Sequence, residues 1–279
     1  MFQLTNLLSF LEKEGAPPRK SLSQNFLVDG NIVKKILRIA DLHPHDTVLE
    51  IGPGAGVFTE ELLNCGVRVL AVETDEKLAE ALKRLQTSDQ RLSVYKEDAL
   101  KIELSTLLDD ASFSCKKKLI SNLPYHIAIP LILRFLPLYT KITSLTFIVQ
   151  KEVAERLTAK PGSKKAGSIS LLIRLLSDPS LQFHIPPSCF YPRPNVASSV
   201  VHLLLKPPPL GIDIRKFEKL IRTSFGQRRK MLRSSLKDLG PQEVLMNAFK
   251  EAQISPTSRP ETITLEQFIA FYFSVHPLL

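Results

Sequence analysis

The chain has 279 residues, 44% of them hydrophobic, and a formal net charge of +9. A chain of this size can bury a full core in one large or two ordinary domains, so we expect a soluble globular protein. Its three cysteines, Cys65, Cys115 and Cys189, form no C-x-x-C pair, which argues against a metal site or a disulfide framework. No basic leader and no run of about 18 apolar residues is present. We therefore expect a cytoplasmic protein without a signal peptide or membrane helix.

The positive charge lies in the second half of the chain. Residues 1–150 carry 18 basic and 18 acidic side chains, whereas residues 151–279 carry 19 basic and 10 acidic ones. Residues 206–250 alone hold 11 Lys or Arg, including Arg228, Arg229 and Lys230, against 4 Asp or Glu. A single basic triplet is more often a solvated face. An excess spread over half the chain instead predicts a nucleic-acid partner, because neutralising phosphates releases counterions.

Short β-branched runs alternate with helical patterns along the first half. An amphipathic pattern at 31–42 follows Asp29, a candidate N-cap, and a second helix at 58–66 ends at Gly66. Strand, helix and strand at this spacing predict βαβ units and a parallel sheet, that is, an α/β fold. The predicted strands are 48–51, 68–72, 92–95, 118–121, 144–149 and a last one at 198–205.

The proline cluster KPPPLG after the last strand is a candidate domain boundary. Beyond it, residues 213–225, 230–239, 241–252 and 264–273 have helical spacing. We therefore predict a first domain over 1–206, with 1–40 as an N-terminal helical lid, and a small α-helical, nucleic-acid-binding domain over 207–279.

Three glycines, Gly52, Gly54 and Gly56, directly follow the first predicted strand in the stretch EIGPGAGVFT. Glycine is needed where a ligand approaches the backbone more closely than a Cβ allows. The dinucleotide fingerprint would need another glycine at position 57, where Val57 stands, and no Gly-Lys-Ser/Thr follows to complete a P-loop. By itself, the turn is also compatible with a tight strand-to-helix connection.

Two carboxylates end the next two predicted strands, Glu73 in VETD and Asp98 in EDAL. Ligands of open α/β sheets bind over the carboxyl ends of the strands, where an acid can accept from ribose hydroxyls or from an adenine amine. Either acid alone could be a surface residue or a helix cap. Together with the glycine turn, they predict a nucleoside pocket without a pyrophosphate site, which suits S-adenosyl-L-methionine.

The fourth predicted strand ends in SNLPYH, residues 121–126. The side-chain oxygen of Asn122 and a backbone carbonyl of Leu123 or Pro124 can accept the two hydrogens of an exocyclic amine such as adenine N6. Tyr125 can stack on the extruded base. We expect His126 to be a packing or water-bonded residue rather than a general base. Taken alone, the stretch is also compatible with a strand that ends at a proline and has no catalytic role.

Several blocks occur together in one order, and they identify a family resemblance. The chain resembles the ribosomal RNA adenine N6,N6-dimethyltransferases, above all those acting on the bacterial small subunit. The blocks are SLSQNFL (21–27), EIGPGAGVFT (50–59), VETD (72–75), EDAL (97–100), SNLPY (121–125), FIVQKEVAERL (147–157), FYPRPNVASSVV (190–201) and FGQRRKML (225–232).

The resemblance implies the Rossmann-like sheet of class I S-adenosylmethionine-dependent methyltransferases and transfer to two adjacent adenosines near the 3′ end of 16S rRNA. The small ribosomal subunit or its precursor is the implied partner, and we expect a monomer. The implied catalytic loop is Asn122, Leu123, Pro124 and Tyr125. The implied cofactor-binding residues are Asn25, Leu27, Gly52, Gly54, Glu73, Asp98, Ala99 and Asn122, and the RNA-binding residues are Lys164, Lys165, Arg228, Arg229 and Lys230.

Two positions depart from the family pattern. Ser23 replaces a usual glycine in the lid, and Ala166 stands where a tyrosine is common in a basic loop. Cofactor affinity and RNA contacts could therefore differ from those of the family.

Three alternative functions compete with this one. A ribosome-assembly factor with secondary methylation stays open, although a pure binding protein has no need of the methyl-donor residues. A large-subunit methyltransferase is disfavoured by the FGQRRKML block. A 5-methylcytosine enzyme is disfavoured because its nucleophile would be a cysteine after proline, whereas Cys189 follows Ser188.

Overall fold

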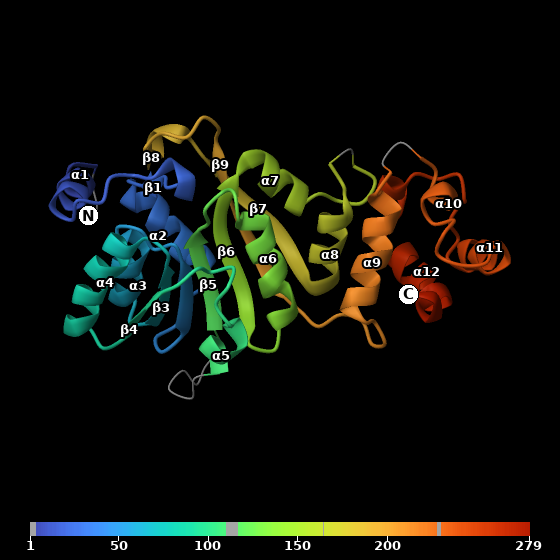
Figure 1. Ribbon diagram of the computed structural model, residues 1–279, viewed down its shortest axis with the longest axis horizontal. Helices are drawn as coiled ribbons and strands as arrows, with labels where there is room; N and C mark the ends of the chain where they lie inside the picture. The colour runs from blue at the N-terminus through green and yellow to red at the C-terminus, as the bar shows by residue number, and fades with distance from the viewer. Residues whose placement is uncertain (1–3, 110–116, 164, 228–229) are drawn as a thin grey trace. The chain divides into compact units, whose positions relative to one another are not determined.

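The structure is a computed structural model that describes residues 4–109, 117–163, 165–227 and 230–279 (Figure 1). The chain forms two compact units. The first contains Met1–Ala154 and Ser180–Leu205, and the second contains Glu155–Pro179 and Lys206–Leu279. The last segment of the second unit starts at Lys206, at the beginning of the proline cluster.

The placement of residues 155–179 in the first domain was wrong. Helix α8 (Ser168–Leu176) buries a run of leucines and isoleucine, and it packs against α9 (Ile214–Phe225) and α12 (Leu265–Val275) of the second unit. This apolar face is covered by helices from beyond the proline cluster, so the cluster marks only one of the connections between the units.

A seven-stranded sheet forms the centre of the first unit, in the order β4-β3-β2-β5-β6-β9-β7 (Figure 1). Strands β2 to β6 are parallel where they pair, and β9 runs antiparallel to β6 with Phe147 opposite Val201. The predicted α/β fold is confirmed: β2 to β6 are longer than predicted by one to three residues, β9 has the predicted bounds, and β7 was not predicted. The bounds are β2 Thr47–Ile51, β3 Arg68–Glu73, β4 Leu92–Lys96, β5 Lys117–Asn122, β6 Ile142–Gln150, β7 Ser177–Ile185 and β9 Ser198–Leu205.

Helices α2 (Gly30–Ile39) and α3 (Val57–Asn64) share one apolar core with the sheet. Alternation along each strand sends Val48, Val69 and Ile120 into this core. Asp29 caps α2 as predicted, because its carboxylate accepts from the backbone N–H groups of Asn31 and Ile32. The remaining helices are α1 Leu4–Lys13, α4 Glu76–Ser88, α5 Leu104–Asp109, α6 Ala128–Phe135 and α7 Lys151–Leu157, the last of which spans the division between the units.

The second unit is held by an aromatic core. Tyr272 of α12 meets Phe217 of α9 edge to face at 5.7 Å, and Phe271 meets Phe249 of α11 (Gln242–Glu251) at 4.9 Å between ring centroids. The predicted helices at 213–225, 241–252 and 264–273 are confirmed. The pattern at 230–239 forms only the short α10 (Leu232–Ser235).

Candidate active site

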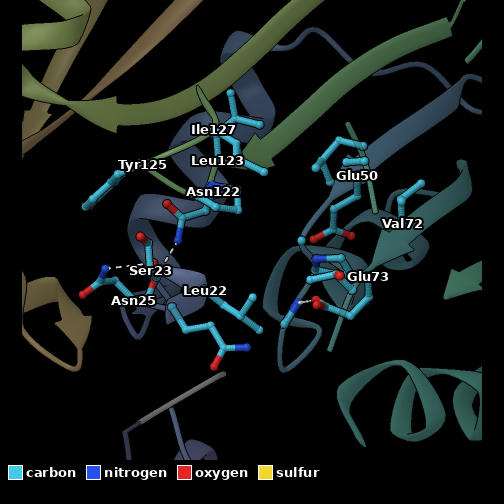
Figure 2. Close-up of a pocket in the computed structure, with 18 of the residues that line it drawn as sticks. Leu22, Ser23, Asn25, Glu50, Val72, Glu73, Asn122, Leu123, Tyr125 and Ile127 are labelled. Atoms are coloured by element: carbon cyan, nitrogen blue, oxygen red, sulfur yellow. Dashed lines mark hydrogen bonds between the residues drawn. The ribbon is translucent and has the colours of Figure 1, made fainter. Parts of the chain in front are cut away.

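The order of strands reverses between β2 and β5, because the chain passes outward through β3 and β4 and then returns. Ligands of open α/β sheets bind in the crevice at such a switch point. A pocket lies there (Figure 2), and every predicted catalytic and cofactor-binding residue lines it. These residues are Asn25, Leu27, Gly52, Gly54, Glu73, Asp98, Ala99, Asn122, Leu123, Pro124 and Tyr125.

The glycine turn is tied to the end of β3. The backbone N–H of Gly52 donates to the carbonyl of Val72 at 2.8 Å, and that of Gly54 donates to Oε2 of Glu73 at 3.0 Å. Gly54 has a φ of +59°, and a Cβ built on it would lie 2.7 Å from the Phe26 ring. Glycine is therefore required at position 54 by backbone conformation and by the close approach of Phe26.

Glu73 is 4% exposed and receives a hydrogen bond on each oxygen. Besides Gly54, the backbone N–H of Asp75 donates to its Oε1 at 2.8 Å. Burial raises the pKa of Glu73, while these backbone donors oppose the shift. The carboxylate thus fixes the turn on which the pocket is built.

Glu50 is a pocket residue that the sequence analysis missed. It is 2% exposed in β2, and the hydroxyl of Thr59 donates to its Oε2 at 2.7 Å. Burial raises its pKa to about 8, with a smaller contribution in the same direction from the charge of Glu73. At neutral pH this side chain is mostly protonated. The available signal was an acid inside the apolar run VLEI.

The loop after β4 carries Asp98 and Ala99. Oδ1 of Asp98 accepts from the N–H of Leu100 at 2.9 Å. Arg134 of α6 donates to the carbonyls of Ala99 and Ile102 at 2.6 and 2.7 Å, so the loop after β4 is held by the helix that follows the predicted catalytic loop. No sequence pattern pointed to Arg134.

Asn122 ends β5 with a fixed amide orientation. Its Nδ2 donates to the backbone carbonyl of Asn25 at 2.7 Å (Figure 2). A carbonyl can only accept, so this contact identifies the nitrogen and leaves Oδ1 as the other end of the amide. Among the described residues, this oxygen is buried without a hydrogen-bond partner. A buried acceptor without a partner costs about 1–3 kcal/mol, so this oxygen is available to a donor from a ligand or from water.

The rest of the predicted catalytic loop forms a turn into α6. The carbonyl of Pro124 accepts from the N–H of Ile127 at 3.1 Å. The hydroxyl of Tyr125 hydrogen-bonds to Oγ of Ser198 at 2.7 Å. Burial raises the pKa of Tyr125, so the ring stays neutral at pH 7.

The segment Leu22–Leu27, here called the lid segment, contributes to one side of the pocket (Figure 2). Just before this segment, Arg19 forms an ion pair with the buried Asp75 at 3.3 Å. Within the segment, the side chain of Gln24 donates to the same carboxylate at 3.4 Å. Downstream, the strand β1 (Phe26–Leu27) pairs with β8 (Phe190–Tyr191). The sequence analysis did not predict either pairing.

The predicted RNA-binding residues fall in the second unit, where Lys165 and Lys230 are exposed. Lys165 forms an ion pair with Glu155. Lys164, Arg228 and Arg229 lie outside the described residues. Ala166 is 4% exposed, so a tyrosine at that position would have to displace its neighbours.

Two searches of the described residues bear on other classes of protein. No helix among them is long and apolar enough to cross a membrane. Within the same residues, no group of three or more His, Cys, Asp or Glu side chains is arranged to hold a metal ion.

The model of one protein family, described as ribosomal RNA adenine dimethylase, matches residues 16–275. The chain belongs to this family. It is 42% identical to the ribosomal RNA small subunit methyltransferase A of Protochlamydia amoebophila, over 99% of this chain and 98% of that protein. It is 41% identical to the protein of the same name from Chlamydia muridarum, over 96% of each.

Two solved structures share the fold at 22% identity. A dimethyladenosine transferase from Plasmodium falciparum superposes with a TM-score of 0.78 over 91% of this chain and 98% of that one. The 23S rRNA methyltransferase ErmE superposes with a TM-score of 0.68 over 90% and 99%. The sheet is thus the class I methyltransferase sheet, and the chain is an RNA adenine methyltransferase by family.

Proposed function

We propose that the protein transfers methyl groups from S-adenosyl-L-methionine to N6 of two adjacent adenosines near the 3′ end of 16S rRNA, giving N6,N6-dimethyladenosine. The single observation that carries the proposal is the buried Oδ1 of Asn122 in the pocket, which has no hydrogen-bond donor among the described residues. The names of the relatives support the choice of the small subunit.

The residues of the pocket fit the methyl donor. Glu73 and Asp98 are the acceptors for the ribose hydroxyls and the adenine amine, and Leu27 and Ala99 are buried apolar residues in the same lining. Because Gly54 has no Cβ, the glycine turn can pass close to the Phe26 ring. When bound, S-adenosylmethionine supplies an electrophilic methyl group on a sulfonium sulfur.

Asn122 and Leu123 then act on the target base. Oδ1 of Asn122 and the carbonyl of Leu123 accept the two hydrogens of N6, which favours a pyramidal nitrogen with its lone pair directed at the methyl group. The bond from Nδ2 to Asn25 holds the amide for this purpose before the base arrives. Alignment of this kind can contribute roughly 7–11 kcal/mol to lowering a barrier.

Tyr125 holds the plane of the base. Its ring is anchored through the bond to Ser198, and stacking of a base on an aromatic ring is worth about 1–3 kcal/mol. This offsets part of the cost of extruding the base. No strong base is needed, because the N6 proton becomes acidic only after the methyl group is attached. Water can accept it.

The excess positive charge is proposed to contact RNA phosphates through Lys164, Lys165, Arg228, Arg229 and Lys230. Lys165 would exchange its partner Glu155 for a phosphate. Such contacts bind without reading sequence and weaken as salt is added.

The test is to supply a labelled methyl donor together with undermethylated small subunits, large-subunit RNA or DNA. After digestion, the modified nucleoside is identified by mass spectrometry. We expect N6,N6-dimethyladenosine from the small subunits at a rate at least tenfold above the other two substrates. Equal labelling of large-subunit RNA, or RNA binding with no transfer at all, would contradict the proposal.

A further inference from the structure

Ser23 adopts a backbone conformation that suits glycine. It caps the short helix Lys20–Leu22 with φ of +50° and ψ of +36°, in the left-handed region. Residues other than glycine are uncommon there and are held by their surroundings. Glycine would meet the same backbone requirement with less strain. The backbone conformation therefore gives no advantage to serine at this position. Any advantage of serine over glycine must come from its hydroxyl group.

The hydroxyl of Ser23 has a specific partner. Its Oγ lies 3.0 Å from Nδ1 of His126, the residue that follows the catalytic loop Asn122–Tyr125. Both residues line the pocket. The contact joins positions 103 residues apart in the chain, so it links the lid segment directly to the turn after β5.

A second link joins the same two segments at the other end of the catalytic loop. Nδ2 of Asn122 donates to the carbonyl of Asn25, and Nδ2 of Asn25 donates to the carbonyl of Ser23 at 3.1 Å. The contacts therefore form a closed circuit that runs from Ser23 through Asn25, Asn122 and the loop to His126, and back to Ser23 (Figure 2 shows the first three). The bond to Asn25 uses the backbone carbonyl of Ser23, so removal of the hydroxyl breaks the contact with His126 and keeps the link that orients Asn122.

We propose that the hydrogen bond between Ser23 and His126 is a latch that holds the lid segment over the bound methyl donor, with both side chains acting as positioning residues. The inference rests on the proposed function, since the pocket under the lid segment is taken to hold S-adenosylmethionine. The latch is exposed to water, so its net contribution is modest. It acts mainly on how long the donor stays bound, and much less on transfer once the pocket is full.

Two substitutions separate the hydroxyl from the backbone. Ser23→Ala removes the hydroxyl and keeps a Cβ at positive φ, whereas Ser23→Gly removes the hydroxyl and relieves the strain. We expect Ser23→Ala to raise the dissociation constant for S-adenosylmethionine about threefold to tenfold, mainly through faster dissociation. Ser23→Gly should show a smaller rise. Transfer at saturating donor and RNA should change less than threefold in both.

His126 offers the matching test. His126→Asn keeps a polar atom near the position of Nδ1 and should behave like the wild type, whereas His126→Phe should weaken donor binding as much as Ser23→Ala. The double variant Ser23→Ala with His126→Phe should be no weaker than either single variant, because both remove the same bond. His43→Phe, at an exposed histidine outside the pocket, is the control and should have no effect.

Donor binding is measured by calorimetry and stopped-flow dissociation, and amide hydrogen exchange follows residues 22–27. Faster exchange of these residues in the donor complexes of Ser23→Ala and His126→Phe would support the latch. Unchanged affinity in both single variants, or full additivity in the double variant, would overturn it. Failure of the wild type to bind the donor or to transfer methyl groups would instead refute the proposed function.

Discussion

The tips of β3 and β5, on different sides of the pocket in Figure 2, differ in how completely their polar atoms are hydrogen-bonded. Both oxygens of Glu73 on β3 accept from backbone N–H groups of the chain itself. On β5, the amide nitrogen of Asn122 is bonded, but its oxygen has no partner in the part of the chain that the structure describes. Each oxygen of Glu73 already accepts one bond from the fold and can accept a second from a ligand, whereas Oδ1 of Asn122 is left entirely for a ligand. Substitution should therefore damage architecture at Glu73 and chemistry at Asn122.

The largest effect is expected from Asn122→Ala. Loss of one preorganised polar group from an active site typically costs about 100-fold to 1,000-fold in rate, and we expect a loss of that size in methyl transfer. Affinity for RNA should stay within about threefold, because phosphate contacts dominate it. Single-turnover transfer and RNA binding are measured side by side. Near-normal transfer would remove Asn122 from the mechanism.

Glu73→Gln should change both binding and stability. A glutamine amide would place a donor against the N–H of Gly54 or Asp75, which leaves a buried donor unpaired and costs about 1–3 kcal/mol in free energy of unfolding. The dissociation constant for the methyl donor should rise at least tenfold. Calorimetry and urea unfolding report the two quantities. Weaker binding with unchanged stability would show that the carboxylate does not hold the glycine turn.

Glu50→Gln should alter how stability depends on pH. The pKa of Glu50 is raised from 4.5 to about 8, so between these values the folded protein keeps a proton that the unfolded chain has released. Stability therefore falls as pH rises through this window, by at most about 1.4 kcal/mol per pH unit from this one group. The variant should lose this component and keep a shallower slope from Glu73, whose pKa is raised in the same direction. Unfolding curves between pH 5 and 8 with identical slopes would contradict the burial of Glu50.

The smallest expected effect is a change in the salt dependence of RNA binding when positive charge of the second unit is reversed. Charge reversal at Arg228, Arg229 and Lys230 should reduce the slope of log affinity against log salt by about 0.7 for each RNA phosphate that the variant no longer neutralises. Reversal at Lys34, an exposed residue of α2 in the first unit, is the matched control and should leave the slope unchanged. An unchanged slope in the triple variant would identify the triplet as a solvated surface.

Much of the first unit could be predicted because its signals are local. Buried strands are short β-branched runs, and Asp29 stands directly before the apolar face of α2. The predicted residues Gly52, Glu73, Asp98 and Asn122 line one pocket because they stand at or just after strand ends, which a parallel sheet brings to one edge. A nucleoside pocket is compatible with several reactions. The resemblance of the sequence blocks to the ribosomal RNA adenine dimethyltransferases then indicated methyl transfer to adenine N6.

What could not be predicted depends on contacts between distant segments. The raised pKa of Glu50 follows from its burial. The hydrogen bonds from Arg134 to the carbonyls of Ala99 and Ile102 depend on how α6 packs beside that loop. The partner of Ser23 lies 103 residues away, so the departure from glycine was visible while its consequence was not. Strand β7 contains Pro179 and mostly half-exposed residues, a pattern that argues against a central strand and suits its place at the sheet edge.

The most direct test of the central assignment is to locate the transferred methyl groups on small-subunit RNA after reaction with the wild type and with Asn122→Ala. The account predicts that the wild type places two methyl groups on N6 of each of two adjacent adenosines, and that Asn122→Ala places almost none in the same time. Methyl groups on a ring nitrogen or a ribose oxygen, or equal N6 methylation by the variant, would contradict it.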